Sequence, residues 1–159
     1  MTFKLTYATM FDPPPELHTR FDETLVKVKA ILGKEYGLLI NGKDVFTAEK
    51  IEDRTPIDTG MVLAVIQKGG VKEAQDALAA ARRAFPRWSR TPWQERVAFV
   101  RRAAELMDER LFEIGVVMAL EVGKNRMESL GDVAETADLL RYSCYQMEKN
   151  DGYMVEMMS

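Results

Sequence analysis

The stretch "EVGKNRMESLGDVAE", residues 121–135, joins the end of one helix to the start of the next. Gly123 suits a helix end because glycine adopts the left-handed backbone conformation there without steric cost. From about residue 126 to about residue 148, apolar residues again recur at helical spacing. The stretch therefore predicts two helices that meet at a sharp turn, and this turn organises the C-terminal half of the chain.

Helical periodicity also predicts four helices before this turn, because apolar residues recur every three or four positions in each of them. Pro86 is expected to end the second of these helices. Thr91 is the expected N-cap of the third, with Pro92 in its first turn. The four helices are predicted over residues 16–32, 71–85, 92–109 and 110–121.

The segment between the first two helices has the pattern of strands. In "YGLLINGKDVF", residues 36–46, the pair Asn41-Gly42 favours a type I′ turn and hence a β-hairpin. Residues 55–60 predict a turn, and residues 61–67 a buried strand that Gly69-Gly70 ends. The expected fold class is α/β, mostly helical with a β-hairpin and a short strand.

Three segments follow from this pattern. Residues 1–15 are expected to be an irregular N-terminal arm, which closes with three prolines. Residues 16–150 form the body. Residues 151–159, "DGYMVEMMS", begin with a turn pair and are expected to continue as the first residues of a strand. The methionines of this segment are either a frayed terminus or an apolar edge that binds another chain.

The composition is that of a soluble globular protein, with 47% hydrophobic and 30% charged residues. The net charge of -3 argues against nucleic acid as a partner. A local basic cluster is more typical of a solvated helix end than of a phosphate-binding face. No apolar run approaches the length of a membrane span, and the N-terminus has no secretory signal, so a cytoplasmic location is expected. The basic cluster comprises Arg82, Arg83, Arg87 and Arg90.

The residues themselves predict no catalytic, cofactor-binding or metal site. His18 is the only histidine and falls on the polar side of its helix, where a surface role is expected. Cys144 falls on the apolar stripe of the last helix, which favours a buried thiol over a nucleophile. Gly69-Gly70 lacks the spacing of a dinucleotide-binding fingerprint, and no Cys or His spacing suits a metal.

One polar arrangement in the last helix is a candidate site. Its residues recur at intervals of four and three, which places them on one face opposite the apolar stripe. Their carboxylates could form a solvated face, bind a cation or line a polar cleft. The residues are Glu128, Asp132, Glu135, Leu139 and Tyr142.

Residues 16–159 resemble the N-terminal segment of an aldehyde dehydrogenase. That family combines an Asn-Pro-like turn, a strand, a helix ending in Ala-Phe before a Trp, an Arg-containing helix and Glu-Xaa-Gly-Lys. The matching residues here are Thr55-Pro56, Val62 to Ile66, Ala84-Phe85, Trp88, Glu95-Arg96 and Glu121-Val122-Gly123-Lys124. The resemblance implies the N-terminal part of a cofactor-binding, Rossmann-like domain.

Within that family the pattern is similar to 1-pyrroline-5-carboxylate dehydrogenases, which oxidise glutamate semialdehyde to glutamate with a nicotinamide cofactor. The features that carry this similarity are the helix before the hairpin, the sequence Leu39-Ile40-Asn41-Gly42, and "DVAE" after "EVGKN". In that subgroup the Glu of "DVAE" lies beside the aldehyde-binding cleft. The resemblance therefore implies that Glu135 is a substrate-binding residue.

The family's catalytic cysteine, its base and the Asn that holds the oxyanion have no counterpart in this sequence. The resemblance implies an N-terminal fragment, about the first third of an enzyme, whose residues 151–159 begin an oligomerisation strand. The parent would use NAD or NADP, take an aldehyde and form a homo-oligomer. The chain alone is expected to bind no cofactor, to be inactive and to self-associate. The alternative is an inactive helical domain that binds full-length subunits of the family.

Overall fold

The computed structural model describes residues 12–154. Its helices are α1 (Pro15–Lys29), α2 (Val71–Trp88), α3 (Trp93–Glu109), α4 (Leu111–Val122) and α5 (Arg126–Lys149). Its strands are β1 (Lys34–Tyr36), β2 (Leu38–Ile40), β3 (Lys43–Val45), β4 (Lys50–Arg54) and β5 (Val62–Gln67). The fold is mixed α/β and mostly helical, as the sequence predicts.

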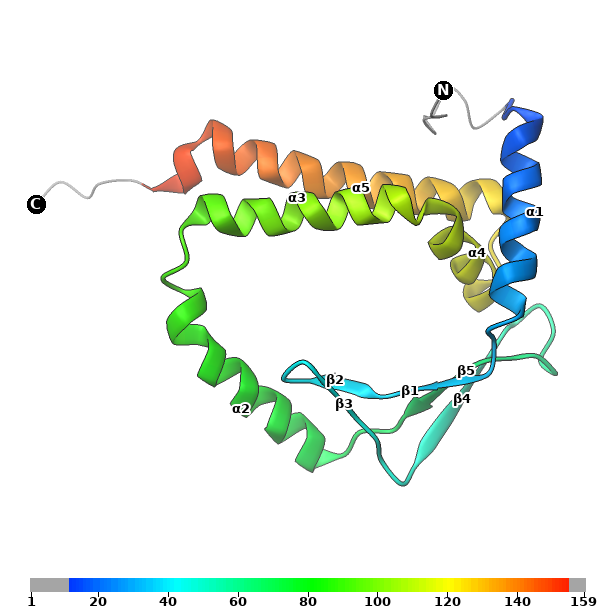
Figure 1. The fold of residues 1–159 in the computed structure, drawn as a ribbon, viewed down its shortest axis with the longest axis horizontal. Helices are drawn as coiled ribbons and strands as arrows, with labels where there is room; N and C mark the ends of the chain where they lie inside the picture. The colour runs from blue at the N-terminus through cyan, green and yellow to red at the C-terminus, as the bar shows by residue number, and fades with distance from the viewer. Residues whose placement is uncertain (1–11, 155–159) are drawn as a thin grey trace, which may run out of the picture.

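The elements are arranged in a ring with two long sides, which α1 and α4 connect at one end and α2 connects at the other (Figure 1). Helices α3 and α5 lie side by side along the first side, with α1 and α4 against the start of α5. The strands form the second side, and α2 leads from β5 back to the start of α3. None of the helices in the described range combines the length and the hydrophobicity that a bilayer crossing requires.

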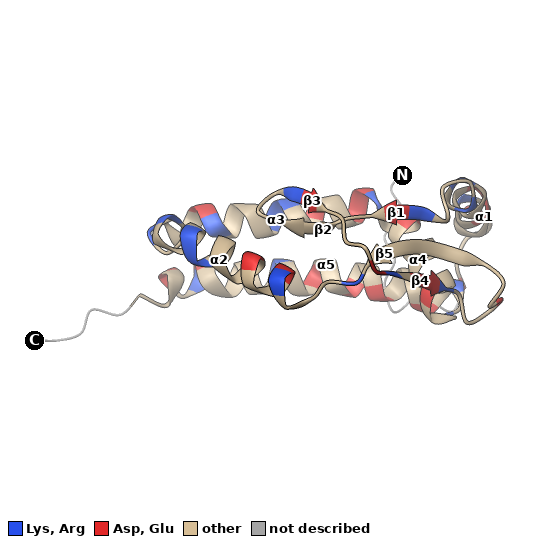
Figure 2. Cartoon of the chain, turned by 90° about the horizontal axis from the view of Figure 1, so that it is seen from below, with Lys and Arg blue, Asp and Glu red and all other residues tan. Residues whose placement is uncertain are grey.

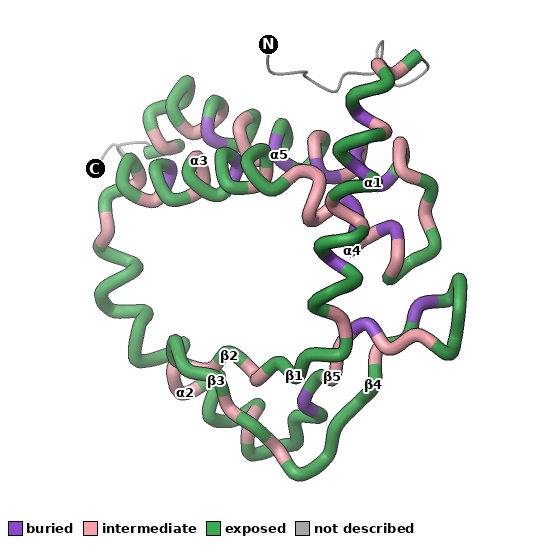
Figure 3. Tube along the Cα trace, turned by 45° about the vertical axis from the view of Figure 1, so that its right-hand side comes forward, coloured by how far each residue is buried: buried purple, intermediate pink, exposed green. Residues whose placement is uncertain are grey.

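The main core lies where α1, α4 and α5 meet. Leu17, Phe21 and Val28 of α1 pack with Val116 of α4 and Leu130 of α5, and all are at most 5% exposed. At Gly115 an added Cβ would lie 2.7 Å from the Leu130 side chain, so the absence of a side chain there lets α4 and α5 approach closely. Buried residues concentrate in this corner and along α5 (Figure 3).

The predicted apolar stripe of α5 is confirmed at four positions, Leu130, Val133, Ala137 and Cys144, which are each at most 2% exposed. Leu140 and Met147 on the same stripe are only partly buried. Leu130 packs with α1 and α4, and further along α5 the stripe faces α3, whose Val97 and Ala104 are buried in turn. The two helices therefore bury one face each and leave the opposite faces open.

The strands form two small sheets. The hairpin β2–β3 is antiparallel, and both turn residues have positive φ, 52° at Asn41 and 72° at Gly42, so the predicted hairpin is confirmed. The other sheet has the order β1-β5-β4, with β1 parallel and β4 antiparallel to β5. The expectation of a buried strand over residues 61–67 is only partly right, because Ile66 is 41% exposed.

Three local expectations for the helices are wrong. Helix α1 ends at Lys29 rather than near residue 32, because a turn leads into β1 there. Helix α2 continues through Pro86 to Trp88; this end is exposed, so water can replace the backbone hydrogen bond that proline cannot make. Thr91 does not cap α3, because its hydroxyl donates instead to the carbonyl of Arg87, 3.2 Å away.

The two chain ends are described only in part. Pro14 is extended and α1 begins at Pro15, whereas residues 1–11 of the expected N-terminal arm lie outside the described residues. Asp151–Tyr153 form a short 3-10 turn, so an expected strand does not begin at Tyr153. Residues 155–159 lie outside the described range. The division into residues 1–15, 16–150 and 151–159 stays a prediction.

Candidate functional site

The turn between α4 and α5 has the predicted geometry. Gly123 adopts the left-handed conformation, with φ 73° and ψ 24°, and its N–H donates to the carbonyl of Ala119. Asn125 then caps α5: its side-chain oxygen accepts from the backbone N–H groups of Met127 and Glu128, at 3.0 Å each. The cap was missed from the sequence, although an Asn just before a helical stretch is its usual signal.

The loop between β4 and β5, more than sixty residues before this turn, contacts the end of α4. Thr55 is 1% exposed, and its hydroxyl donates to the backbone carbonyl of Leu120 near the end of α4. The neighbouring Pro56 lies against Gly123. This contact joins residues that are 65 positions apart, so no local pattern in the sequence could reveal it.

The acidic residues on the predicted polar face of α5 differ in their contacts. Asp132 forms an ion pair with Lys124, and this hydrogen bond raises the pKa of the Lys124 ammonium. Glu128 is exposed in the first turn of α5, where a carboxylate interacts favourably with the helix dipole. Among the described residues, no group of three acidic, His or Cys side chains could hold a metal ion. The cation-binding interpretation of this face therefore has no support.

Glu135 is exposed and forms no hydrogen bond or ion pair with any residue in the described part of the chain. On the same face, Leu139 is 58% and Tyr142 is 59% exposed. Tyr145, which sequence reasoning missed, stacks near Tyr142 with ring centroids 6.5 Å apart and a tilt of 37°. The face thus offers one carboxylate beside apolar and aromatic surface, which could contact a ligand that has both a hydrogen-bond donor and a carbon chain.

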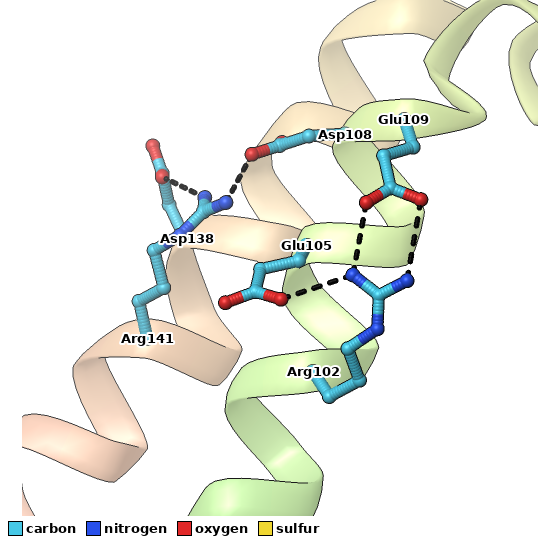
Figure 4. Close-up of polar contacts among 6 residues, drawn as sticks. All are labelled: Arg102, Glu105, Asp108, Glu109, Asp138 and Arg141. Carbon is cyan, nitrogen blue, oxygen red and sulfur yellow. Dashed lines mark hydrogen bonds and ion pairs between the residues drawn. The ribbon is translucent and has the colours of Figure 1, made fainter.

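An ionic network of two clusters lies elsewhere, one cluster within α3 and the other between α3 and α5 (Figure 4). Arg102 binds Glu105 and Glu109 within α3, at 3.0 and 2.9 Å. Arg141 of α5 binds Asp138 at 3.1 Å and also reaches Asp108 of α3. These side chains are 35% or more exposed, and exposed ion pairs contribute little to stability. We assign the network to helix packing rather than to a site.

The other candidates are structural. Cys144 is 2% exposed and its thiol points to the carbonyl of Val97, 3.7 Å away, as expected for a buried thiol. His18 is not the free surface residue that was expected: the Arg126 guanidinium lies 3.2 Å from its Nδ1, where α1 meets α5. The basic cluster on and after α2 is exposed, and basic and acidic residues are interspersed along the elements (Figure 2).

The turn at Gly69-Gly70 does not provide a nucleotide site. It leads from β5 into α2, which is where a dinucleotide-binding fold would place a pyrophosphate. The N–H of Gly70, however, donates to the Glu73 carboxylate at 2.8 Å, and this bond lowers the pKa of Glu73. A carboxylate at this position would repel a phosphate. The residues of this turn therefore do not fit a nicotinamide cofactor.

Comparison with known proteins decides the family. The model of the aldehyde dehydrogenase family matches residues 45–159, which is most of the chain. The chain belongs to the aldehyde dehydrogenase family. Among curated relatives, the 1-pyrroline-5-carboxylate dehydrogenase of Staphylococcus saprophyticus is 37% identical over 133 residues, which are 83% of this chain and 26% of the relative. That of a Geobacillus species is 38% identical over 137 residues, 86% of this chain and 27% of the relative.

The solved structures agree with this assignment. The 1-pyrroline-5-carboxylate dehydrogenase of Thermus thermophilus is 32% identical and has a TM-score of 0.86, over 93% of this chain and 29% of that chain. A Thermus enzyme of the same name, with NAD bound, matches equally well. The chain thus spans about a quarter of the length of its curated aldehyde dehydrogenase relatives.

Proposed function

We propose that this chain is the N-terminal portion of an NAD(P)-dependent aldehyde dehydrogenase whose parent enzyme oxidises glutamate semialdehyde to glutamate. The observation that carries the proposal is the agreement of fold over 93% of the chain with the Thermus thermophilus enzyme, at 32% identity. The parent would act in proline metabolism. Its reaction belongs to the whole enzyme, since residues 1–159 hold no counterpart of the family's nucleophile and base.

The contribution of this chain to substrate binding is one wall of the aldehyde channel. Glu135 is exposed on α5 and no described side chain neutralises it. A free carboxylate can accept hydrogen bonds from the ammonium group that glutamate semialdehyde carries at neutral pH. Leu139 and Tyr142, one and two turns further along, would cover the carbon chain of the same molecule.

The contribution to cofactor binding is indirect. NAD or NADP would accept the hydride in the parent enzyme. Because the Gly69-Gly70 turn does not fit a pyrophosphate, the groups that hold the cofactor would come from other parts of the parent. The helices of this chain would then serve as scaffold for a Rossmann-like domain. The parent would be a cytoplasmic homo-oligomer, with residues 151–159 leading into the oligomerisation strand.

A second function is favoured by a separate observation. Helix α2 has no buried residue, although Leu78, Phe85 and Trp88 are 53%, 65% and 49% exposed. An apolar helix face of this kind is typical of an interaction surface. The chain could therefore be an inactive helical domain that binds full-length subunits of the family.

The test is a chimaeric enzyme in which residues 1–159 are followed by the remaining sequence of the Geobacillus relative. We expect this chimaera to reduce NAD or NADP in the presence of glutamate semialdehyde, and neither part alone to do so. A folded chimaera without activity would contradict the proposal. Activity of the isolated chain that survives Cys144→Ser would contradict it too. Tight binding of the isolated chain to an intact relative would favour the second function.

A further inference from the structure

Thr55 is fixed on three sides at the base of the loop between β4 and β5. Its backbone N–H donates to the carbonyl of Met61 at 3.3 Å, which closes the loop. Its hydroxyl accepts from the N–H of Ile57, also at 3.3 Å, and donates to the carbonyl of Leu120. With 1% of its surface exposed, Thr55 has no access to solvent. The side chain therefore serves a contact inside the molecule.

The partner of Thr55 is a carbonyl that α4 cannot satisfy itself. Leu120 is in the last turn of α4, where a carbonyl has no N–H donor within the helix because no further helical N–H follows. A buried carbonyl without a partner costs more free energy than a formed hydrogen bond contributes. The hydroxyl of Thr55 thus holds the C-terminal end of α4 against the sheet side of the molecule.

The same loop also lies beside the turn that follows. A Cβ added at Gly123 would lie 3.4 Å from the Pro56 ring, so a side chain at this position would contact the loop. Beyond Gly123, Lys124 is paired with Asp132 in the second turn of α5. The start of α5 is consequently fixed from two directions, by the loop before it and by the ion pair along it.

This arrangement determines where Glu135 lies. Asp132 and Glu135 are three residues apart and share one side of α5. The direction of α5 as it leaves the turn therefore sets the position of the Glu135 carboxylate relative to the rest of the molecule. A shift of the turn by a fraction of an ångström would be carried along the rigid helix to Glu135.

We propose that Thr55 is a positioning residue for the aldehyde substrate, which acts through the α4–α5 turn on Glu135. This inference rests on the proposed function of Glu135 as part of the channel wall. Thr55 touches neither substrate nor cofactor. Its hydrogen bond to Leu120 keeps the turn in one conformation. The carboxylate of Glu135 is therefore already in position when the polar end of the substrate binds.

The experiment compares two aldehydes in the chimaeric enzyme. Glutamate semialdehyde has an ammonium group that Glu135 can bind, whereas propanal has no charged group, so the ratio of their kcat/KM values reports on contacts with the polar end of the substrate. We expect Thr55→Val, which keeps the shape but loses the hydroxyl, to lower this ratio about fivefold, as for one lost hydrogen bond. The effect should appear mainly in the KM for glutamate semialdehyde. Thr55→Ser retains the hydroxyl and should restore the ratio.

Glu135→Gln separates this inference from the proposed function. If Thr55 acts through Glu135, the double variant should have the same ratio as Glu135→Gln alone. Independent effects of the two substitutions, or an equal loss of activity on both aldehydes in Thr55→Val, would overturn the inference and leave the role of Glu135 intact. An unchanged ratio in Glu135→Gln would overturn the role of Glu135 itself, and with it the action of Thr55 on the substrate.

A second measurement does not depend on activity. Hydrogen–deuterium exchange of the chimaeric enzyme reports whether the backbone amides from Gly123 to Glu128 open more often when the hydroxyl is lost. We expect Thr55→Val to speed their exchange about fivefold relative to Thr55→Ser, since one hydrogen bond is removed. Equal exchange in the two variants would show that Thr55 does not hold the turn and would overturn the inference.

Discussion

At the scale of single residues, the structure distinguishes three carboxylates of α5 that look alike in the sequence. Glu128, Asp132 and Glu135 are three carboxylates on one helix face, yet Asp132 is paired with Lys124 and Glu128 lies at the start of α5. Glu128 and Glu135 are both exposed and form no ion pair with a described residue, but Glu135 lies further along α5, beside Leu139 and Tyr142. The sequence periodicity predicted the face, and the resemblance to a family singled out Glu135. The ion pair that distinguishes Asp132 becomes visible only in the structure.

The first prediction concerns Glu135 in the chimaeric enzyme. Glu135→Ala should lower kcat/KM for glutamate semialdehyde by more than about tenfold, which corresponds to about 1.4 kcal/mol of transition-state stabilisation. The loss follows from the removal of the carboxylate that, in the proposed function, binds the ammonium group of the substrate. Steady-state kinetics with both aldehydes measures it.

Glu128→Ala is the matched control, because Glu128 is an exposed carboxylate on the same helix. Its kcat/KM should change by less than about twofold, as is usual for a surface substitution. Equal effects at the two positions would mean that Glu135 is not a substrate-binding residue. A Glu135→Ala enzyme that keeps its activity but unfolds at lower temperature would mean the same.

At the scale of elements, the sequence predicted those helices and turns that depend mainly on interactions between neighbouring residues. The helices, the β2–β3 hairpin and the turn at Gly123 follow from apolar spacing and from residues with special backbone freedom. Strands β1, "KEY", and β4, "KIEDR", were not predicted, because they are short and charged and are formed by pairing with β5. The contact of Thr55 with Leu120 depends on the folding of distant segments, so it could not be read from the sequence.

The second prediction concerns pH and the ion pairs of α3. Hydrogen bonds from Arg102 hold the pKa of Glu109 below its ordinary value of 4.5. A carboxylate with a lowered pKa in the folded state stabilises the fold above pH 4.5, and this contribution is lost as the pH falls through the lowered pKa. The contribution of this exposed pair to the melting temperature should therefore be small, constant near neutral pH and lost in acid.

Glu109→Gln tests the cause of this pH dependence. The variant should melt slightly below the parent chain at neutral pH and at the same temperature as the parent chain once Glu109 is protonated. Circular dichroism measures both melts. Glu121→Gln is the control, because Glu121 forms no ion pair with a described residue. If the melting temperature of the Glu109→Gln chain equals that of the parent chain at every pH, the ion pair of Glu109 does not cause the pH dependence.

At the scale of the whole molecule, the apolar surface is unevenly covered. The corner where α1, α4 and α5 meet has a core, whereas α2 has no buried residue and Ile66 of β5 is 41% exposed. The chain spans about a quarter of the length of its curated relatives. We infer that the open face of α2 and of the sheet is completed by other parts of the parent enzyme.

The third prediction follows for the isolated chain. Because apolar side chains such as Leu78 and Phe85 are exposed, we expect the chain to bind a hydrophobic dye and to self-associate with increasing concentration. Sedimentation velocity and dye fluorescence measure these properties. Phe85→Ser should reduce both, whereas the exposed Glu128→Ala should change neither. A single monomer peak with a cooperative melt and no bound dye would favour an independent domain.

The central claim, that this chain is one part of a larger aldehyde dehydrogenase, is tested most directly by the hydrogen–deuterium exchange of α2. We measure this exchange in the isolated chain and in the chimaera with the Geobacillus relative. If the remaining enzyme covers α2, its amides should exchange at least about tenfold more slowly in the chimaera, because the helix then opens only with the domain. Equally fast exchange of α2 in the isolated chain and in a folded chimaera would contradict the claim.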